Sequence, residues 1–274
     1  MAGWLGELEL AYGWQQEQTI AYRTYASAPL KLQRSFYPEG GRVCHNVLLH
    51  TAGGYVGGDR LRQTITLDPH CHALITTAAA AKVYGRAQSP VEQRIHCTIA
   101  AGASLEWLPQ ETILFHGAQY HHHLHIDLAP TAHVCLWEMT RFGRTARGEA
   151  FLAGHCRSRT EVWQAGVPLW IDPQYLEGTP LWLASRNGLA ECTLVGTFAW
   201  IGAAISPEQV MALRELGSDL QGERGVSRLI QGVVCRYRGH STAELRRWFI
   251  AVWQLLRHHL HPNHPPCQPR VWPL

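Results

Sequence analysis

An internal repeat limits the folds available to this chain more than any other feature of its sequence. Three segments superimpose: TITLDPHCHALITT (64–77), HCTIAAGASLEWLP (96–109) and HIDLAPTAHVCLWE (125–138). Each reads as an alternating strand, a Pro or Gly turn and a second strand, with Leu67, Ile99 and Leu128 in equivalent places. A two-strand unit of this kind cannot bury its apolar face alone. We therefore expect a mainly β fold of stacked layers over about 64–138, helical-β (solenoid-like) or sandwich-like, although successive hairpins would give the same pattern.

The flanking segments extend this β pattern. Residues 4–34, 147–176 and 191–204 alternate between apolar and polar side chains, and residues 226–238 read as one more strand. No low-complexity linker divides the chain, so we predict one domain over 1–274.

Two helices are expected near the C-terminus. Ser206, followed by proline and glutamate, is typical of a helix start and predicts a helix over about 206–217. Apolar residues at 3/4 spacing predict a stronger helix over about 241–260. Prolines forbid helix in 262–274, which we expect to be an extended tail anchored by Trp272.

Composition excludes several classes of protein. With 46% hydrophobic and 16% charged residues, the chain can bury a sizeable core. A net charge of +3 without any Lys/Arg run argues against nucleic acid, and the apolar runs are too short to cross a membrane. The eight cysteines are scattered singly and the N-terminus lacks the features of a secretory signal, which together indicate a cytoplasmic protein.

A glycine-rich loop lies within residues 36–59. Its four glycines are Gly53, Gly54, Gly57 and Gly58. Glycine is preferred where the backbone needs φ > 0 or a close approach, so the loop should form a tight, unusual turn. Asp59 at its exit is placed to accept hydrogen bonds from backbone N–H groups of that turn. The Lys-Ser/Thr pair of a phosphate-binding loop is missing, which argues against nucleotide binding.

Histidines are concentrated in two places. On a strand, His121, His123 and His125 would share one face, where imidazoles can hold zinc, nickel or copper. The same run is also compatible with a polar strand that faces solvent. The second group, His258, His259, His261 and His264, lies at the predicted end of the last helix, where the helix dipole favours histidine without any metal.

Two acids interrupt apolar strands of the repeat. Glu106 and Glu138 lie at matching or neighbouring positions, and a carboxylate there is costly to bury unless it is paired or faces water. They predict either a polar internal channel or ion pairs with Arg141, Arg144 or Arg147. Recognisable catalytic motifs such as Gly-x-Ser-x-Gly and His-Glu-x-x-His are absent from the sequence.

Four sequence blocks together resemble the urease accessory protein UreD family, called UreH in some bacteria. They are FYPEGG…CHNVLLHTAGGYVGGDRL, HALITTAAAAKVYGR, LEWLPQETILFHGA and FGRTARGEAF, in this order within about residues 4–200. The closing PRVWPL also resembles the family's ending. The resemblance implies a mostly β fold with a stacked, helical β arrangement and two helices.

The resemblance also implies a function. Members of this family are non-catalytic chaperones that bind the urease structural subunits and recruit UreF, which in turn docks the nickel-carrying GTPase UreG. No cofactor would be tightly bound: Ni²⁺ would be in transit through a proposed water-filled tunnel, and GTP would be bound by UreG. The alternatives are a histidine-rich nickel-binding or storage protein, and a metal-dependent hydrolase that uses the histidine strand with Glu106 or Glu138.

Individual residues match the family's motifs. Asp59 matches the aspartate after the double glycine, Glu149 matches the acid of the FGRxxxGE block, and Glu138 falls where relatives place an acid. Lys82 and Tyr84 match a Lys-x-Tyr pattern. The resemblance makes these five residues candidates for lining the tunnel or locking its loops. The 121–125 histidine run matches no family pattern, so a nickel-holding role for it is a separate hypothesis.

Overall fold

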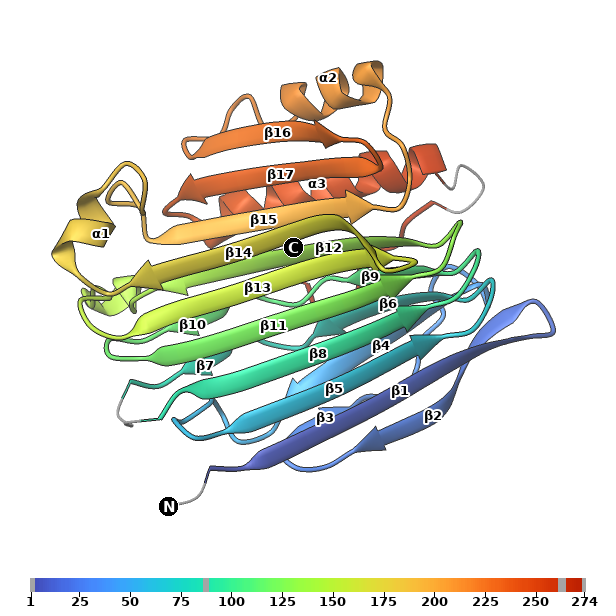
Figure 1. Cartoon of the computed structure of the whole chain (residues 1–274), viewed down its shortest axis with the longest axis horizontal. Helices are drawn as coiled ribbons and strands as arrows, with labels where there is room; N and C mark the ends of the chain where they lie inside the picture. The colour runs from blue at the N-terminus through green and yellow to red at the C-terminus, as the bar shows by residue number, and fades with distance from the viewer. Residues whose placement is uncertain (1–2, 86–88, 261–264, 273–274) are drawn as a thin grey trace.

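Two β-sheets form the framework of the protein. The structure, a computed structural model, describes residues 3–85, 89–260 and 265–272 of the 274-residue chain. Sheet A has seven strands in the order β14 (Val167–Glu177), β13 (His155–Gln164), β11 (Gln119–Leu128), β8 (Val91–Ile99), β5 (Arg60–Leu67), β1 (Leu5–Gln15) and β2 (Gln18–Ala26). Figure 1 shows the strands of sheet A as successive rungs, with β2 at the bottom of the stack and β14 near the top.

Sheet B lies behind sheet A in Figure 1. Its main order is β16 (Glu223–Leu229), β17 (Gly232–Gly239), β15 (Leu194–Ile201), β12 (His133–Phe142), β9 (Ser104–Trp107), β6 (His72–Thr77), β4 (Val43–His50) and β3 (Leu30–Leu32). Two short strands, β7 (Ala81–Val83) and β10 (Thr112–Leu114), pair beside β12.

The chain passes from one sheet to the other at every strand of the repeat. β5, β8 and β11 pair in parallel within sheet A, while β6, β9 and β12 pair in parallel within sheet B. The repeat positions lie in register: Leu67 pairs with Ile99, and Ile99 pairs with Leu128. Parallel neighbours about one repeat apart are the signature of stacked coils, so the predicted mainly β, solenoid-like fold is confirmed and the hairpin alternative is wrong.

Each sheet shows the sequence pattern that its surroundings require. Sheet A has one face toward the core and one toward solvent, so β5 alternates between buried and exposed residues. β9 of sheet B is buried at every position because it is covered on both faces. Between the sheets, Ile65, Leu124 and Val134 are fully buried in one continuous apolar core.

A second apolar core lies on the other face of sheet B, under α3 (Thr242–Leu260). The helix buries an apolar stripe against the sheet, in which Trp248 and Phe249 contact the aromatic residues of β12, β15 and β17. Trp272 closes this core: it is 5% exposed, packs against Trp137 and Trp253, and donates Nε1–H to Thr76 Oγ1 at 2.9 Å. Residues 262–264 and 273–274 of the predicted tail lie outside the described residues.

The structure differs from the sequence expectations in two places. Residues 226–238 belong to two antiparallel strands, β16 and β17, and the turn that separates them leaves Ile230 93% exposed. A short helix, α1 (Pro180–Ala184), precedes α2 (Pro207–Glu215) and α3. Thr179 caps α1 ahead of a proline, as Ser206 caps α2, so the same start signal is present at both helices.

Candidate functional site

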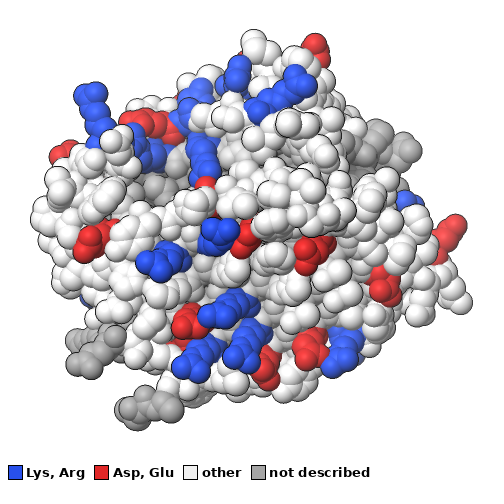
Figure 2. Space-filling model, viewed as in Figure 1, with Lys and Arg blue, Asp and Glu red and all other residues white. Residues whose placement is uncertain are grey.

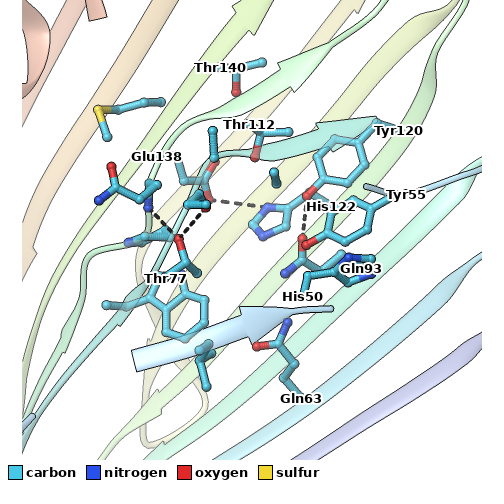
Figure 3. A pocket seen from close by; sticks show the side chains of 18 of the residues that line it. His50, Tyr55, Gln63, Thr77, Gln93, Thr112, Tyr120, His122, Glu138 and Thr140 are labelled. Carbon is cyan, nitrogen blue, oxygen red and sulfur yellow. Dashed lines mark hydrogen bonds and ion pairs between the residues drawn. The ribbon is translucent and has the colours of Figure 1, made fainter. Parts of the chain in front are cut away.

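A cavity lined by both polar and apolar side chains lies between the two sheets. Its volume is about 150 Å³, enough for roughly five water molecules. Side chains from both sheets converge on it (Figure 3). The polar residues that line it are His50, Tyr55, Gln63, Thr77, Gln93, Gln110, Thr112, Tyr120, His122, Glu138, Thr140 and Ser158. Among the described residues that line the cavity, Glu138 is the single acid, and there is no lysine or arginine.

Interruptions of the sheet B strands shape one side of this cavity. β6 ends at Thr77 and the chain resumes pairing at Ala81 in β7, while β9 ends at Trp107 and resumes at Thr112 in β10. Residues 78–80 between the first pair are alanines and line the cavity. Thr77 Oγ1 accepts a hydrogen bond from the backbone N–H of Gln110 at 2.9 Å, which holds the two interruptions side by side.

Glu138 is held by neutral donors. It projects from β12 toward sheet A, where Ser158 donates its hydroxyl to Oε2 at 3.0 Å and Thr160 donates its hydroxyl to Oε1. His122 Nδ1 lies 3.5 Å from Oε1 (Figure 3). Burial lowers the pKa of His122, although Glu138 opposes this shift, so the imidazole is neutral at pH 7. The Glu138 carboxyl group therefore has no arginine or lysine partner within the described cavity lining.

Several polar atoms of the cavity wall have no protein partner. Both ring nitrogens of His50 and Oε1 of Gln63 are buried without a hydrogen bond in the described part of the chain. Buried polar groups are costly when unsatisfied, so this wall suits water or a hydrated ligand. Tyr120 on the same wall is satisfied, because its hydroxyl donates to Gln93 Oε1 at 2.6 Å.

A second cavity continues past Glu138. Its volume is about 290 Å³, and it shares Glu138, Thr140, Cys156 and Ser158 with the first. Further along, its wall includes Gln174 and Thr197. The two cavities therefore meet at one carboxylate, which lies where the internal polar space passes between β12 and β13.

Asp59 lies outside this lining and ties the glycine loop together. It is 4% exposed, and its carboxylate accepts backbone N–H groups from Trp4 and Val56, each at 2.9 Å. In the loop, Gly53 has φ +73° and Gly58 has φ +91°, a region that favours glycine. The loop carries Tyr55 into the cavity wall.

Lys82 and Tyr84 belong to the same unit as the glycine loop. The backbone N–H of Tyr55 donates to the carbonyl of Lys82 at 2.7 Å, and the N–H of Tyr84 donates to the carbonyl of Tyr55 at 2.9 Å. A Cβ atom at Gly54 would lie 2.4 Å from the Tyr84 ring, so only glycine fits there. The Lys82 side chain is exposed, and it is the Lys82 backbone that holds the loop.

Glu149 also holds a loop. It forms an ion pair with Arg144 and accepts the backbone N–H of His116 at 3.1 Å. These hydrogen bonds lower the pKa of the Glu149 carboxyl below its usual value, against a smaller effect of burial. The structure thus places Glu138 in the cavity, and Asp59 and Glu149 in separate loop contacts.

Glu106 and Glu138 are offset by three residues in the paired strands β9 and β12, so their side chains lie on opposite faces of sheet B. Glu106 is fully buried beneath α3 and forms an ion pair with Arg257, not with Arg141, Arg144 or Arg147 as the sequence suggested. His72 Nε2 lies 2.8 Å from the same carboxylate, and Trp253 donates Nε1–H to it at 2.8 Å. The expected partners were wrong because Arg257 approaches from the second core, which sequence spacing does not reveal.

The three histidines of the 121–125 run lie on the outer face of sheet A. His121 contacts His155, His123 contacts Glu161, and His125 contacts Asp127. His122 points the other way, into the cavity. The hydrolase alternative requires His123 near Glu106 or Glu138, and the structure places these residues on different faces of the sheets. His261 and His264 of the second histidine group lie outside the described residues.

Lowered histidine pKa values predict sensitivity to acid. Burial lowers the pKa of His50, His72 and His122, and lowers that of His133 to about 4. In the unfolded chain these histidines take up protons at about pH 6.5, whereas in the folded chain they do so only at lower pH. The neutral histidines therefore contribute fully to the free energy of unfolding at pH 7, and this contribution is lost as pH falls from about 6.5 toward 4. We expect the melting temperature to drop by roughly 5 °C or more between pH 7.5 and 4.5.

Thermal unfolding followed by circular dichroism across this pH range checks the expectation. A His122→Gln variant, which cannot bind the proton, should show a shallower decline than the native chain. A melting temperature that stays constant down to pH 4.5 would contradict it.

Sequence reasoning missed most of the residues around Glu138. His122 alternates with His121 and His123 along β11, and this alternation was the available signal, but the sequence does not show which face of the strand is turned toward the core. Ser158 and Thr160 lie in β13, which follows the repeat, and nothing in their local sequence marks them.

None of the described helices is long and apolar enough to cross a membrane.

Stacked β coils around an internal cavity, covered on one side by a long helix, define a solenoid-like β protein. A family model described as UreD urease accessory protein matches residues 5–273. The chain belongs to the UreD family of urease accessory proteins, as the sequence blocks predicted, and this membership supports a role in urease maturation.

Relatives match along nearly their whole length. The urease accessory protein UreD of Thermosynechococcus vestitus is 67% identical over 273 residues, covering 100% of both chains. That of Trichormus variabilis is 52% identical over 270 residues, 98% of this chain and 96% of the relative. A Synechocystis UreD is 37% identical over 258 residues, 93% of this chain and 96% of the relative.

Proposed function

We propose that this chain is a cytoplasmic, non-catalytic maturation chaperone for urease. In this role it binds the urease structural subunits, recruits UreF and through it the GTPase UreG, and lets Ni²⁺ pass along the internal polar space. The observation that carries the proposal is the position of Glu138, where two cavities meet inside a member of the UreD family.

The chemistry of the cavity wall suits transit better than storage. A single carboxylate attracts a divalent cation, and the hydroxyls, amides and the two imidazoles of the cavity wall, His50 and His122, can hydrogen-bond the water that remains on the ion. Tight nickel or zinc sites combine several imidazoles or thiolates. Cys156 lines both cavities, but burial raises its pKa to about 12, so the thiol stays protonated and is a poor ligand at neutral pH.

Affinity purification tests the scaffold role. An affinity-tagged chain co-expressed with the urease structural subunits, UreF and UreG should retain urease apoprotein with and without UreF, and retain UreG only when UreF is present. The tagged chain alone should not hydrolyse urea or bind GTP. Failure to retain urease apoprotein under any of these conditions would overturn the proposal, as would urea hydrolysis by the chain alone.

A further inference from the structure

A cluster of potential metal ligands lies on the outer face of sheet A, on the side of the sheet away from the cavity. Its members come from neighbouring strands in register: His96 on β8 pairs with His125 on β11, and His125 pairs with Glu161 on β13. His123 and Asp127 flank His125 on the same face of β11. Paired β-strands hold these positions rigidly, unlike the loops that carry many surface histidines.

Two imidazoles share one carboxylate within this cluster. His96 Nε2 lies 2.8 Å from Asp127 Oδ2, and His125 Nε2 lies 3.2 Å from Asp127 Oδ1. One ligand atom from each residue lies within 4.8 Å of the other two. Metal–ligand distances of about 2.0–2.2 Å place neighbouring donors roughly 3 Å apart, so small side-chain rotations would bring the three donors around one ion.

A second group on the same face is less suitable. His123, His125 and Glu161 also lie within 4.8 Å of one another. The carboxylate of Glu161, however, already accepts hydrogen bonds from Arg159 at 2.9 and 3.2 Å and from Trp163 at 3.0 Å. An adjacent guanidinium repels a cation and occupies the oxygens that would bind it. Asp127 has no arginine contact among its described hydrogen bonds and ion pairs, which favours the first group.

We propose that His96, His125 and Asp127 form a surface site for a borderline divalent transition metal such as Ni²⁺, Zn²⁺ or Cu²⁺. Two imidazoles and one carboxylate are a donor set that these ions prefer over Mg²⁺ or Ca²⁺. The side chains of His96, His125 and Asp127 are 54%, 32% and 48% exposed, so water can fill the remaining coordination positions. On the outer face, Lys and Arg side chains are interspersed with Asp and Glu side chains (Figure 2). The face therefore has no uniformly positive surface that would repel a cation.

The site is distinct from the conduit around Glu138. Sheet A separates it from the cavity, and its two imidazoles and one carboxylate lie within reach of one ion, whereas His50, His122 and Glu138 of the cavity do not form such a group of three in the described part of the chain. It therefore holds an ion at the surface of the chain. Metal binding at this surface can therefore be measured separately from passage of Ni²⁺ through the cavity.

Equilibrium dialysis of the chelator-treated full chain against Ni²⁺ and Zn²⁺, with metal quantified by mass spectrometry, tests the site. We expect a bound ion whose affinity falls about tenfold or more in His125→Ala and Asp127→Asn. His121→Ala is the matched control, because His121 lies on the same strand and face but contacts His155. Equal binding by the native chain and His125→Ala would overturn the proposal, as would an equal loss in His121→Ala.

Electron paramagnetic resonance with Cu²⁺ provides an independent readout. Nitrogen hyperfine structure from two imidazoles is expected for the native chain, and from one imidazole for His96→Asn. Circular dichroism of each variant verifies the fold. A spectrum that does not change in His96→Asn would show that the ion binds elsewhere and would refute the assignment, whatever the outcome of urease activation.

Discussion

Replacing Arg257 by alanine is expected to destabilise the protein by about 3–5 kcal/mol, which lowers its melting temperature by roughly 10 °C. Arg257 is fully buried and forms ion pairs with Glu106 and Glu39. Its removal leaves two buried carboxylates without their cation, and His45 and His72 contact these carboxylates without supplying a permanent charge. The loss is large because the uncompensated charge, not the absent contact, dominates the cost.

Arg247→Ala is the matched control for this experiment. Arg247 lies on the same helix and pairs with Asp219 at 3.1 Å, but both side chains are more than half exposed. Exposed ion pairs contribute about 0–1 kcal/mol, so this variant should melt close to the native chain. Equal losses in Arg247→Ala and Arg257→Ala, measured by urea denaturation, would contradict the role assigned to the buried cluster.

The same cluster determines how Glu106 responds to acid. Burial alone would raise the pKa of the Glu106 carboxyl, but Arg257, His72 and Trp253 together hold it well below its usual range. A lowered carboxyl pKa contributes stability above the unfolded pKa of about 4.3, and this contribution is lost only as pH falls further. Glu106 therefore stays ionised over the pH range in which the buried histidines lose their contribution.

Glu138→Gln is expected to slow nickel-dependent activation of urease by about tenfold or more while the complex with urease remains assembled. Removing the unit charge of the carboxylate should raise the free-energy barrier for a partly desolvated cation passing it by at least about 1.4 kcal/mol. This corresponds to a tenfold decrease in rate. Glutamine keeps the size of the side chain: its amide oxygen can accept a hydrogen bond from one of the two hydroxyls of Ser158 and Thr160, and its NH2 group can donate to the other. The rate of urease activation at limiting Ni²⁺, together with recovery of the complex by affinity purification, provides the measurement.

Two further variants serve as controls for Glu138→Gln. Glu9→Gln removes an exposed acid on β1 that pairs with Arg23, and should activate urease at the native rate. Asp59→Asn should act mainly on stability, since Asp59 binds the backbone of Trp4 and Val56 and does not line the cavity. Native activation rates in Glu138→Gln would show that the carboxylate is structural and that the ion does not pass it.

Periodicity was sufficient to predict the stacking of the β coils. The equivalence of Leu67, Ile99 and Leu128 depends only on local alternation and spacing, and the strands do pair at these positions. The start of α2 likewise follows from its own capping residues, Ser206 and Gln209. Features whose cause is local in the chain are therefore predictable from the sequence.

The environment of the acids depends on distant segments, and this limited the prediction. Glu106 and Glu138 interrupt similar strands, but their side chains point to opposite faces of sheet B, one under α3 and one into the cavity. Arg257 lies 151 residues from Glu106 in the chain. The pairing of His96 with Asp127 similarly needs the parallel register of β8 and β11, which the repeat indicates only approximately.

The last rung of sheet A has a consequence for how the molecule behaves at high concentration. An open stack of parallel coils could grow without limit by adding identical coils from other molecules at its free end. At this end β14 presents Pro168 and Pro173, which lack the amide hydrogen that a newcomer would need, and it runs antiparallel to β13. This edge of sheet A is therefore a poor template for a further parallel coil from another copy of the protein.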